Sequence, residues 1–230
     1  PKALEAIAQC AADTRFYPDF DNYSLREALA AANGVSFDQV LPGAGSSDLI
    51  LQVSRGWLNA QRHAIVPQYS FAAYESTAAA QGAKTVVVPA KGWDHDLDAL
   101  VAAVTDETAV IFLATPNNPI GTAVAPADLE AFLAAVPAHV LVVLDEAYRE
   151  FLPTDEQPDL KRLMAIRENL LVLRTFSKIH GLAALRVGYG IARPEILSIL
   201  KRLQMPFAVS TAGQAAAEAA LADPDFAQAY

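Results

Sequence analysis

Short apolar runs alternate with longer segments of mixed polarity along most of this chain. Six runs are rich in branched side chains and predict strands over 64–67, 85–89, 109–114, 140–144, 170–173 and 187–192. The segments between them predict helices over 70–81, 96–104, 126–136 and 161–167. Nearly unbroken apolar strands are typical of a sheet covered on both faces. The pattern therefore predicts an α/β fold with a mostly parallel sheet sandwiched between helices.

Local signals mark where several of these helices begin and end. Ser24 and Glu27 have the spacing of a capping box, and Gly34 after Asn33 is a stop signal. Pro126 fits the first turn of its helix, and the Ala-rich stretch 214–221 is amphipathic enough to be a helix. No internal repeat or low-complexity linker divides the chain, so we expect a single large domain over 1–230.

Composition narrows the functional classes. The 230 residues are 53% hydrophobic and 19% charged, with a formal net charge of −9, which argues against a bulk nucleic-acid binder. Cys10 is the only cysteine, which excludes an intramolecular disulfide and fits a reducing, cytoplasmic compartment. No apolar run approaches the roughly 18 residues of a membrane helix. The chain starts at Pro1 and its last segment reads as an unfinished helix, so we expect both ends to be cut.

The segment 174–186, Arg-Thr-Phe-Ser-Lys-Ile-His-Gly-Leu-Ala-Ala-Leu-Arg, is the most informative. Lys178 directly follows a buried-looking strand, where a lysine can form a Schiff base with an aldehyde cofactor. Ser177 and Arg186 can hold the phosphate of that cofactor. No His, Cys or carboxylate cluster has the spacing of metal ligands, so we expect no metal site. His180, two residues from Lys178, is interpreted as a packing or pocket-lining residue and not as a catalyst.

A second phosphate-binding element is predicted at 42–48, Pro-Gly-Ala-Gly-Ser-Ser-Asp. The glycines precede an apolar stretch that reads as a helix start, where free N–H groups and the helix dipole favour an anion. Ser46 and Ser47 would supply the contact. The alternative is an ordinary turn; the segment has neither Walker nor dinucleotide-binding spacing.

Three further clusters follow strand-like runs. Tyr69 can stack on a flat ring or simply pack under its loop. Asn118 lies in a Pro- and Gly-containing loop after 109–114, and that loop could also be a plain turn. Asp145 ends the next apolar run, where a buried carboxylate needs a partner, and Tyr148 follows it. A Walker B strand also ends in Asp-Glu, but no Walker A loop accompanies it.

In order and spacing these clusters resemble the fold type I pyridoxal-phosphate aminotransferases, over about residues 15–192. The resemblance implies a PLP-dependent transferase-like large domain with a sheet of about seven strands. It also implies that pyridoxal 5'-phosphate (PLP) is held by Lys178, the catalytic residue, with Asp145 at the protonated ring nitrogen. The other implied cofactor contacts are Ser46, Ser47, Ser177 and Arg186 at the phosphate, Tyr69 over the ring, and Asn118 and Tyr148 at the phenolic oxygen.

The same resemblance implies how the chain is organised and assembled. Residues 1–23 would form an N-terminal arm, and the connection to a largely absent C-terminal small domain would start after about 205. Tyr17, in a Phe-Tyr-Pro-Asp segment, would reach the phosphate in the neighbouring subunit of a homodimer. From the residues alone, Tyr17 could equally be a packed loop aromatic.

Within the superfamily, segments 17–19, 68–71, 145–148 and 175–178 look most like those of the histidinol-phosphate aminotransferases. That resemblance implies exchange of an amino group between L-histidinol phosphate and 2-oxoglutarate, in histidine biosynthesis. An aromatic-amino-acid aminotransferase remains an alternative, because enzymes of that type share these segments. A threonine-phosphate decarboxylase is another alternative, because the 43–49 run also fits that enzyme. A noncatalytic PLP-binding domain of a regulator is a further one.

Overall fold

The computed structural model describes residues 1–223 and 226. The chain forms two compact units: a terminal unit of Pro1–Leu49 and Arg174–Tyr230, and a central unit of Ile50–Leu173. The boundaries fall within helix α3 (Ser46–Trp57) and strand β6 (Leu170–Thr175). The unfinished helix expected at the C-terminal end lies mostly outside the described residues.

The central unit contains a parallel sheet with the order β6-β5-β4-β2-β3. Its other strands are β2 (His63–Pro67), β3 (Thr85–Val88), β4 (Thr108–Ala114) and β5 (Leu141–Asp145). Every residue of β4 and β5 is buried, as the unbroken apolar runs predict. Ala114 lies opposite Asp145, and Asp145 lies opposite Leu173. The carboxyl ends of three strands therefore meet at one edge of this sheet.

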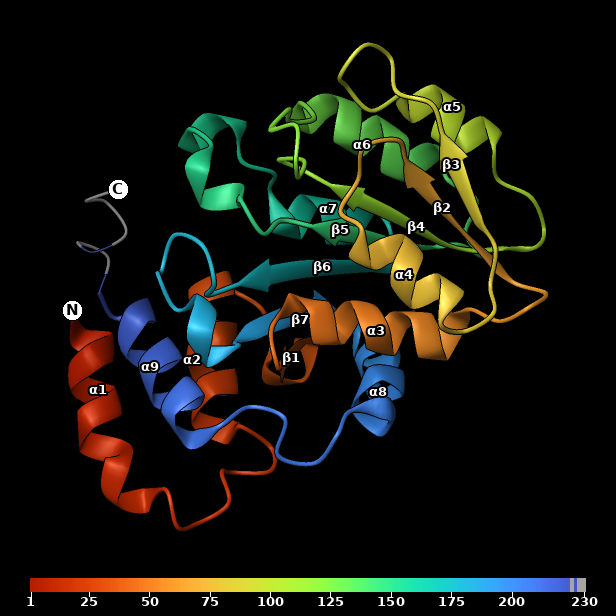
Figure 1. The fold of residues 1–230 in the computed structure, drawn as a ribbon. Coiled ribbons are helices and arrows are strands. Elements are labelled where there is room, and N and C mark those ends of the chain that lie inside the picture. The colour runs from red at the N-terminus through yellow and green to blue at the C-terminus, as the bar shows by residue number, and fades with distance from the viewer. Residues whose placement is uncertain (224–225, 227–230) are drawn as a thin grey trace. The chain divides into compact units, whose positions relative to one another are not determined.

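Four helices of the central unit overlap the four predicted ones: α4 (Ala73–Ala79), α5 (Leu97–Ala102), α6 (Pro126–Ala135) and α7 (Leu160–Ile166). Pro126 occupies the first turn of α6, as predicted. Figure 1 shows α4 below β2 and β4 and α5 and α6 above them, so helices cover both sides of these strands. Two 3-10 turns, η3 (Arg149–Phe151) and η4 (Thr154–Glu156), follow β5.

Strand β3 departs from the expected burial on both faces. Val86 and Val87 are 37% and 45% exposed, although the run is as apolar as its neighbours. Strand β3 is the last strand in the order β6-β5-β4-β2-β3 and is therefore an edge strand. The sequence pattern does not distinguish such an end strand from a central one.

The terminal unit is built around an antiparallel pair of strands. Strands β1 (Val40–Gly43) and β7 (Gly188–Ala192) pair with Val40 opposite Ile191. The end of β6 joins them, because Phe176 N–H donates to the Val187 carbonyl at 3.0 Å. Seven strands thus lie within the described residues, most of them parallel, and the predicted α/β class is confirmed.

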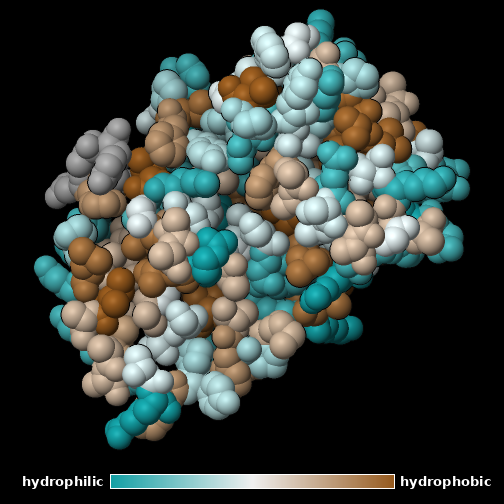
Figure 2. All heavy atoms as spheres, viewed as in Figure 1, coloured by the Kyte–Doolittle hydropathy of each residue, from teal (hydrophilic) through white to brown (hydrophobic). Residues whose placement is uncertain are grey.

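The helices of the terminal unit are α1 (Lys2–Cys10), α2 (Tyr23–Asn33), α8 (Pro194–Leu203), α9 (Thr211–Leu221) and the start of α3, with 3-10 turns η1 (Ala11–Asp13), η2 (Phe37–Gln39) and η5 (Ala183–Leu185). Helix α1 packs against α9 (Figure 1). Figure 2 shows hydrophobic side chains at the surface over these two helices. The predicted helix over 214–221 is confirmed within α9.

The predicted capping box at Ser24 is wrong. Helix α2 begins at Tyr23, so Ser24 already lies inside its first turn. The Asp19 carboxylate accepts the Tyr23 N–H instead, at 2.5 Å. A capping box does form at Ser36, which precedes η2 and is paired with Gln39. The stop signal is confirmed, since Gly34 ends α2 with φ +62°.

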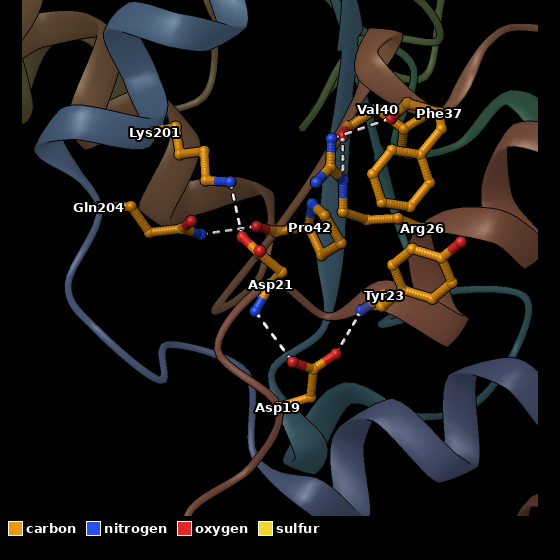
Figure 3. Close-up of polar contacts among 9 residues, drawn as sticks. All are labelled: Asp19, Asp21, Tyr23, Arg26, Phe37, Val40, Pro42, Lys201 and Gln204. Carbon is orange, nitrogen blue, oxygen red and sulfur yellow. Dashed lines mark hydrogen bonds and ion pairs between the residues drawn. The ribbon is translucent and has the colours of Figure 1, made fainter.

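A polar network ties the chain after Tyr17 to the rest of the terminal unit (Figure 3). Asp21 forms an ion pair with Lys201 of α8, with 2.6 Å between Oδ1 and Nζ. The hydrogen bond from Lys201 lowers the pKa of the Asp21 carboxyl. Gln204 donates to the Pro42 carbonyl at 2.6 Å, and Arg26 donates to the carbonyls of Phe37 and Val40. The segment from Asp19 onward is therefore anchored to α8 and to β1.

None of the helices in the described part of the chain combines the length and the hydropathy that a membrane-spanning helix requires.

Candidate active site

Lys178 lies in a tight turn three residues after β6, in the terminal unit. The Gly181 N–H donates to the Lys178 carbonyl at 2.9 Å, and the Ser177 N–H donates to Thr175 Oγ1 at 3.1 Å. Ile179 beside it is buried, whereas Lys178 is exposed. The turn thus fixes the backbone of the lysine while its side chain remains accessible to a ligand.

Arg186 lies next to Ser177, as expected for two groups that bind one phosphate. Its Nη1 donates to Ser177 Oγ at 3.3 Å and to the Ala183 carbonyl at 2.9 Å. The residue adopts φ +55°, a left-handed conformation that is uncommon for a side chain of this size. Such conformations cluster at functional sites, because the surrounding structure must impose them.

Two glycines bring the start of α3 against this arginine. A Cβ on Gly45 would lie 2.5 Å from Arg186 Nη2, and one on Gly188 would lie 2.3 Å from the Ser46 backbone nitrogen. Gly45 also has φ +84°. Ser46 and Ser47 are the first two residues of α3, whose first N–H groups have no intrahelical acceptor. The Arg186 guanidinium, the Ser177 hydroxyl and the start of α3 therefore lie in one region. We call this region the anion cradle (Ser46, Ser47, Ser177, Arg186).

Asp145 occupies the carboxyl end of β5 in the central unit and is only 5% exposed. Its Oδ1 accepts the Ala147 N–H at 3.1 Å, and its Oδ2 accepts the Tyr74 hydroxyl at 2.8 Å. Burying a carboxylate is costly without such partners. The two donors hold both oxygens in a defined orientation at the edge of the sheet.

Asn118 and Tyr148 line the same cavity, and their common role at a phenolic oxygen stays a prediction. The cavity has a volume of about 320 Å³ and is lined by Pro116, Asn117, Asn118, Pro119, Gly121, Tyr148, Phe151 and Leu152. Asn118 follows β4, and Tyr148 lies three residues after Asp145. Both thus belong to the loops at the edge where β4 and β5 end, on the side expected for a ligand in an α/β sheet.

Tyr69 follows β2 and is 43% exposed, with φ +61°. Its ring contacts Trp93 with centroids 5.5 Å apart, and its carbonyl accepts Asn117 Nδ2 at 3.2 Å. A stacking role for Tyr69 stays a prediction. The ring of Phe71, two residues further on, lies edge-on to that of Tyr74, with centroids 5.7 Å apart.

The sequence interpretation missed Tyr74 and Asn117. Tyr74 lies in the predicted helix 70–81, and the sequence assigns it no functional role. In the structure, its hydroxyl contacts Asp145 directly. One signal was present: Phe71, Tyr74 and Ala78 have helical spacing, and a tyrosine on a buried helix face needs a hydrogen-bond partner. Asn117 is buried, and its Oδ1 has no partner among the described residues.

His180 packs as expected. Its ring lies 4.9 Å from that of Phe176, and burial lowers the pKa of its imidazole. No group of three or more metal-ligating side chains occurs among the residues that the structure describes.

Tyr17 lies on the surface of the terminal unit, 81% exposed. It stacks on Phe207 with centroids 4.6 Å apart, and Phe20 meets the same ring edge-on. The Tyr17 ring is therefore held at the surface by its aromatic neighbours and is accessible to another molecule.

The predicted residues thus form two groups. Ser46, Ser47, Ser177, Lys178 and Arg186 belong to the terminal unit, and Tyr69, Asn118, Asp145 and Tyr148 belong to the central unit. Within each group the chemistry fits PLP. The anion cradle suits a phosphate, and the buried Asp145 carboxylate suits a protonated ring nitrogen. The cavity beside Asn118 and Tyr148 has donors for a phenolic oxygen.

The chain belongs to the class I and II aminotransferases, a family whose sequence profile matches residues 1–230. Among its relatives is histidinol-phosphate aminotransferase 2 of Pseudomonas fluorescens, 47% identical over 226 residues, which covers 98% of this chain and 61% of the relative. The histidinol-phosphate aminotransferase of Brevibacillus brevis is 44% identical, with 98% and 62% coverage.

A solved structure agrees with these relatives. The histidinol-phosphate aminotransferase of Sinorhizobium meliloti, in complex with pyridoxal-5'-phosphate, superimposes with a TM-score of 0.96 at 36% identity, covering all of this chain and 62% of the other. A threonine-phosphate decarboxylase from Porphyromonas gingivalis shares the fold, with a TM-score of 0.84 at 23% identity over 97% of this chain and 66% of the other. The chain therefore spans about three fifths of the length of the curated relatives.

Proposed function

We propose that the full-length protein is a PLP-dependent aminotransferase that exchanges an amino group between L-histidinol phosphate and 2-oxoglutarate. The observation that carries this proposal is the 47% identity to a histidinol-phosphate aminotransferase across nearly the whole chain. The threonine-phosphate decarboxylase alternative rests on the 43–49 run and on a likeness of fold at 23% identity. We further propose that 1–230 corresponds to one PLP-binding large domain with an arm over 1–23, continuing after about 205 toward a small domain.

Lys178 would hold the cofactor and then act on the substrate. Bound PLP supplies an aldehyde carbon that condenses with an amine and a ring that withdraws electrons from the substrate carbon. The free amine of Lys178 would move a proton at that substrate carbon, as general base and then general acid. Its exposed side chain on a fixed backbone turn is suited to this exchange of partners.

The central-unit residues would orient the ring and set its charge. Asp145, buried and held through both oxygens, would keep the ring nitrogen protonated. Asn118 and Tyr148 would donate to the phenolic oxygen from their shared cavity. Tyr69 would cover one face of the ring.

The anion cradle would hold the phosphate so that PLP stays bound while Lys178 changes partners. In the full-length protein, we expect Gly45→Ala to raise the dissociation constant for PLP about tenfold, the effect of losing one hydrogen bond to a charged group. The added methyl would displace the Arg186 guanidinium, whose Nη2 lies 2.5 Å from its position. Absorbance titration of the apoprotein with PLP measures the effect.

Gly82→Ala is the matched control for this variant. Gly82 also has a positive φ, of +70°, but nothing lies within 4 Å of the Cβ position. Both variants should lose similar stability from left-handed backbone strain. An equal loss of PLP affinity in both would contradict a specific role of the Gly45–Arg186 contact.

We also propose that the active form is a homodimer in the cytoplasm, with small-molecule substrates. The exposed, aromatic-supported Tyr17 would reach the phosphate in the neighbouring subunit. The single Cys10 is compatible with that reducing compartment.

The test uses the full-length protein reconstituted with PLP. Adding L-histidinol phosphate without a 2-oxo acid should abolish the absorbance of lysine-bound cofactor, and 2-oxoglutarate should restore it. A faster response to L-phenylalanine would favour the aromatic-amino-acid aminotransferase. Release of carbon dioxide from L-threonine O-3-phosphate would favour the decarboxylase. PLP binding without reaction of any of these amines would favour the noncatalytic regulator.

A further inference from the structure

Tyr74 is a fully buried tyrosine whose hydroxyl meets a charged group. The residue lies on α4, and its oxygen is 2.8 Å from Asp145 Oδ2 on β5. Its ring stacks on Phe112 of β4, with centroids 4.9 Å apart and planes 5° apart, and meets Phe71 edge-on. Packing on two sides fixes the ring, so the direction in which the hydroxyl points is set by the core of the central unit.

The direction of this hydrogen bond follows from burial and charge. Burial, together with the neighbouring Asp145 carboxylate, raises the pKa of Tyr74 well above its ordinary value. The phenol therefore stays protonated and donates, and the carboxylate accepts. A donor to the ionised form of an acid favours that form. With Ala147 N–H on Oδ1, each oxygen of Asp145 accepts a hydrogen bond.

We propose that Tyr74 is a positioning residue that orients the Asp145 carboxylate and keeps it ionised toward the ring nitrogen of the cofactor. This inference rests on the proposed function. It goes beyond that function because none of the predicted cofactor contacts includes Tyr74. The competing interpretation is that Tyr74 only fills the core, in which case its ring matters and its hydroxyl does not.

Tyr74→Phe separates these two interpretations, because it keeps the ring between Phe112 and Phe71 and removes only the oxygen. In the full-length holoenzyme, we expect kcat to fall at least about tenfold, as for loss of a hydrogen bond to a charged group, with little change in KM for the amino donor. Tyr23→Phe is the control, since Tyr23 is exposed and belongs to the terminal unit.

The affinity of the apoprotein for PLP, measured from about pH 5 to pH 8, gives a readout other than activity. Without its tyrosine donor, Asp145 should take up a proton at higher pH than in the parent protein and then no longer pair with a protonated ring nitrogen. The Tyr74→Phe variant should therefore lose PLP affinity on acidification at a higher pH than the parent. The Tyr23→Phe variant should follow the parent.

Asp145→Asn completes a double-mutant cycle. If the tyrosine acts through the charge of Asp145, adding Tyr74→Phe to Asp145→Asn should change kcat little. Additive effects, or an unshifted pH profile of PLP affinity despite a lowered melting temperature, would overturn the inference and leave Tyr74 a core residue. Absence of PLP binding by the parent protein would instead overturn the proposed function, and this inference with it.

Discussion

Replacing Lys178 by alanine in the full-length protein is expected to reduce transamination by at least about 10⁴-fold, because the residue is both the covalent anchor of the cofactor and the proton carrier. Lys178→Arg should be equally inactive, since a guanidinium stays protonated and cannot act as a base. Steady-state assays with L-histidinol phosphate and 2-oxoglutarate measure both variants. Lys161→Ala, at an exposed position of α7, is the matched control and should retain parental activity.

A covalent readout strengthens this test. Borohydride reduction of the parent holoenzyme should fix PLP on the peptide that contains Lys178, as detected by mass spectrometry after digestion. The alanine variant should carry no such label and should release PLP on dialysis more readily. Normal turnover in Lys178→Ala, or labelling at another lysine, would refute the assignment of Lys178.

The sequence predicts a strand where burial on both faces produces an unbroken run of apolar residues. The runs 109–114 and 140–144 match β4 and β5 within one residue at each end, because these strands are buried throughout. Strand β1 was not predicted. It is short, contains Pro42 and Gly43, and exists through pairing with β7, near the other end of the chain. The hydrophobic periodicity of a short segment gives no information about a pairing strand that lies far away in the sequence.

The candidate site shows the same division between local and distant information. The segments that hold Lys178, Asp145 and Asn118 are selected from their residue types and order. The structure places Asp145 at the carboxyl end of β5, and Lys178 and Asn118 in the loops after β6 and β4. The contact between Tyr74 and Asp145 joins residues 71 positions apart, so local helical spacing can indicate that Tyr74 is buried but not which residue it contacts. The failed capping box at Ser24 has a local cause instead, because Asp19, four residues before Tyr23, binds the start of α2.

Asp145 should be the second most sensitive position. We expect Asp145→Asn and Asp145→Ala to lower kcat by about 10²–10³-fold, the usual effect of removing one preorganised electrostatic group. Asparagine keeps the size of the side chain and an oxygen for the Tyr74 hydroxyl, but it removes the charge and the acceptor for the Ala147 N–H. PLP should still bind to both variants through the anion cradle, although with lower affinity than to the parent protein. Single-turnover absorbance changes with L-histidinol phosphate measure the chemical step directly.

Asp106→Asn is the appropriate control, because Asp106 is an exposed carboxylate in the turn before β4. It should leave both PLP binding and turnover unchanged. If Asp145 served only to stabilise the sheet, Asp145→Asn would change the melting temperature. The single-turnover rate would then stay within about twofold of the parent. That result would remove Asp145 from the ring nitrogen, and the positive charge there would then require another partner, since an unpaired buried charge is strongly destabilising.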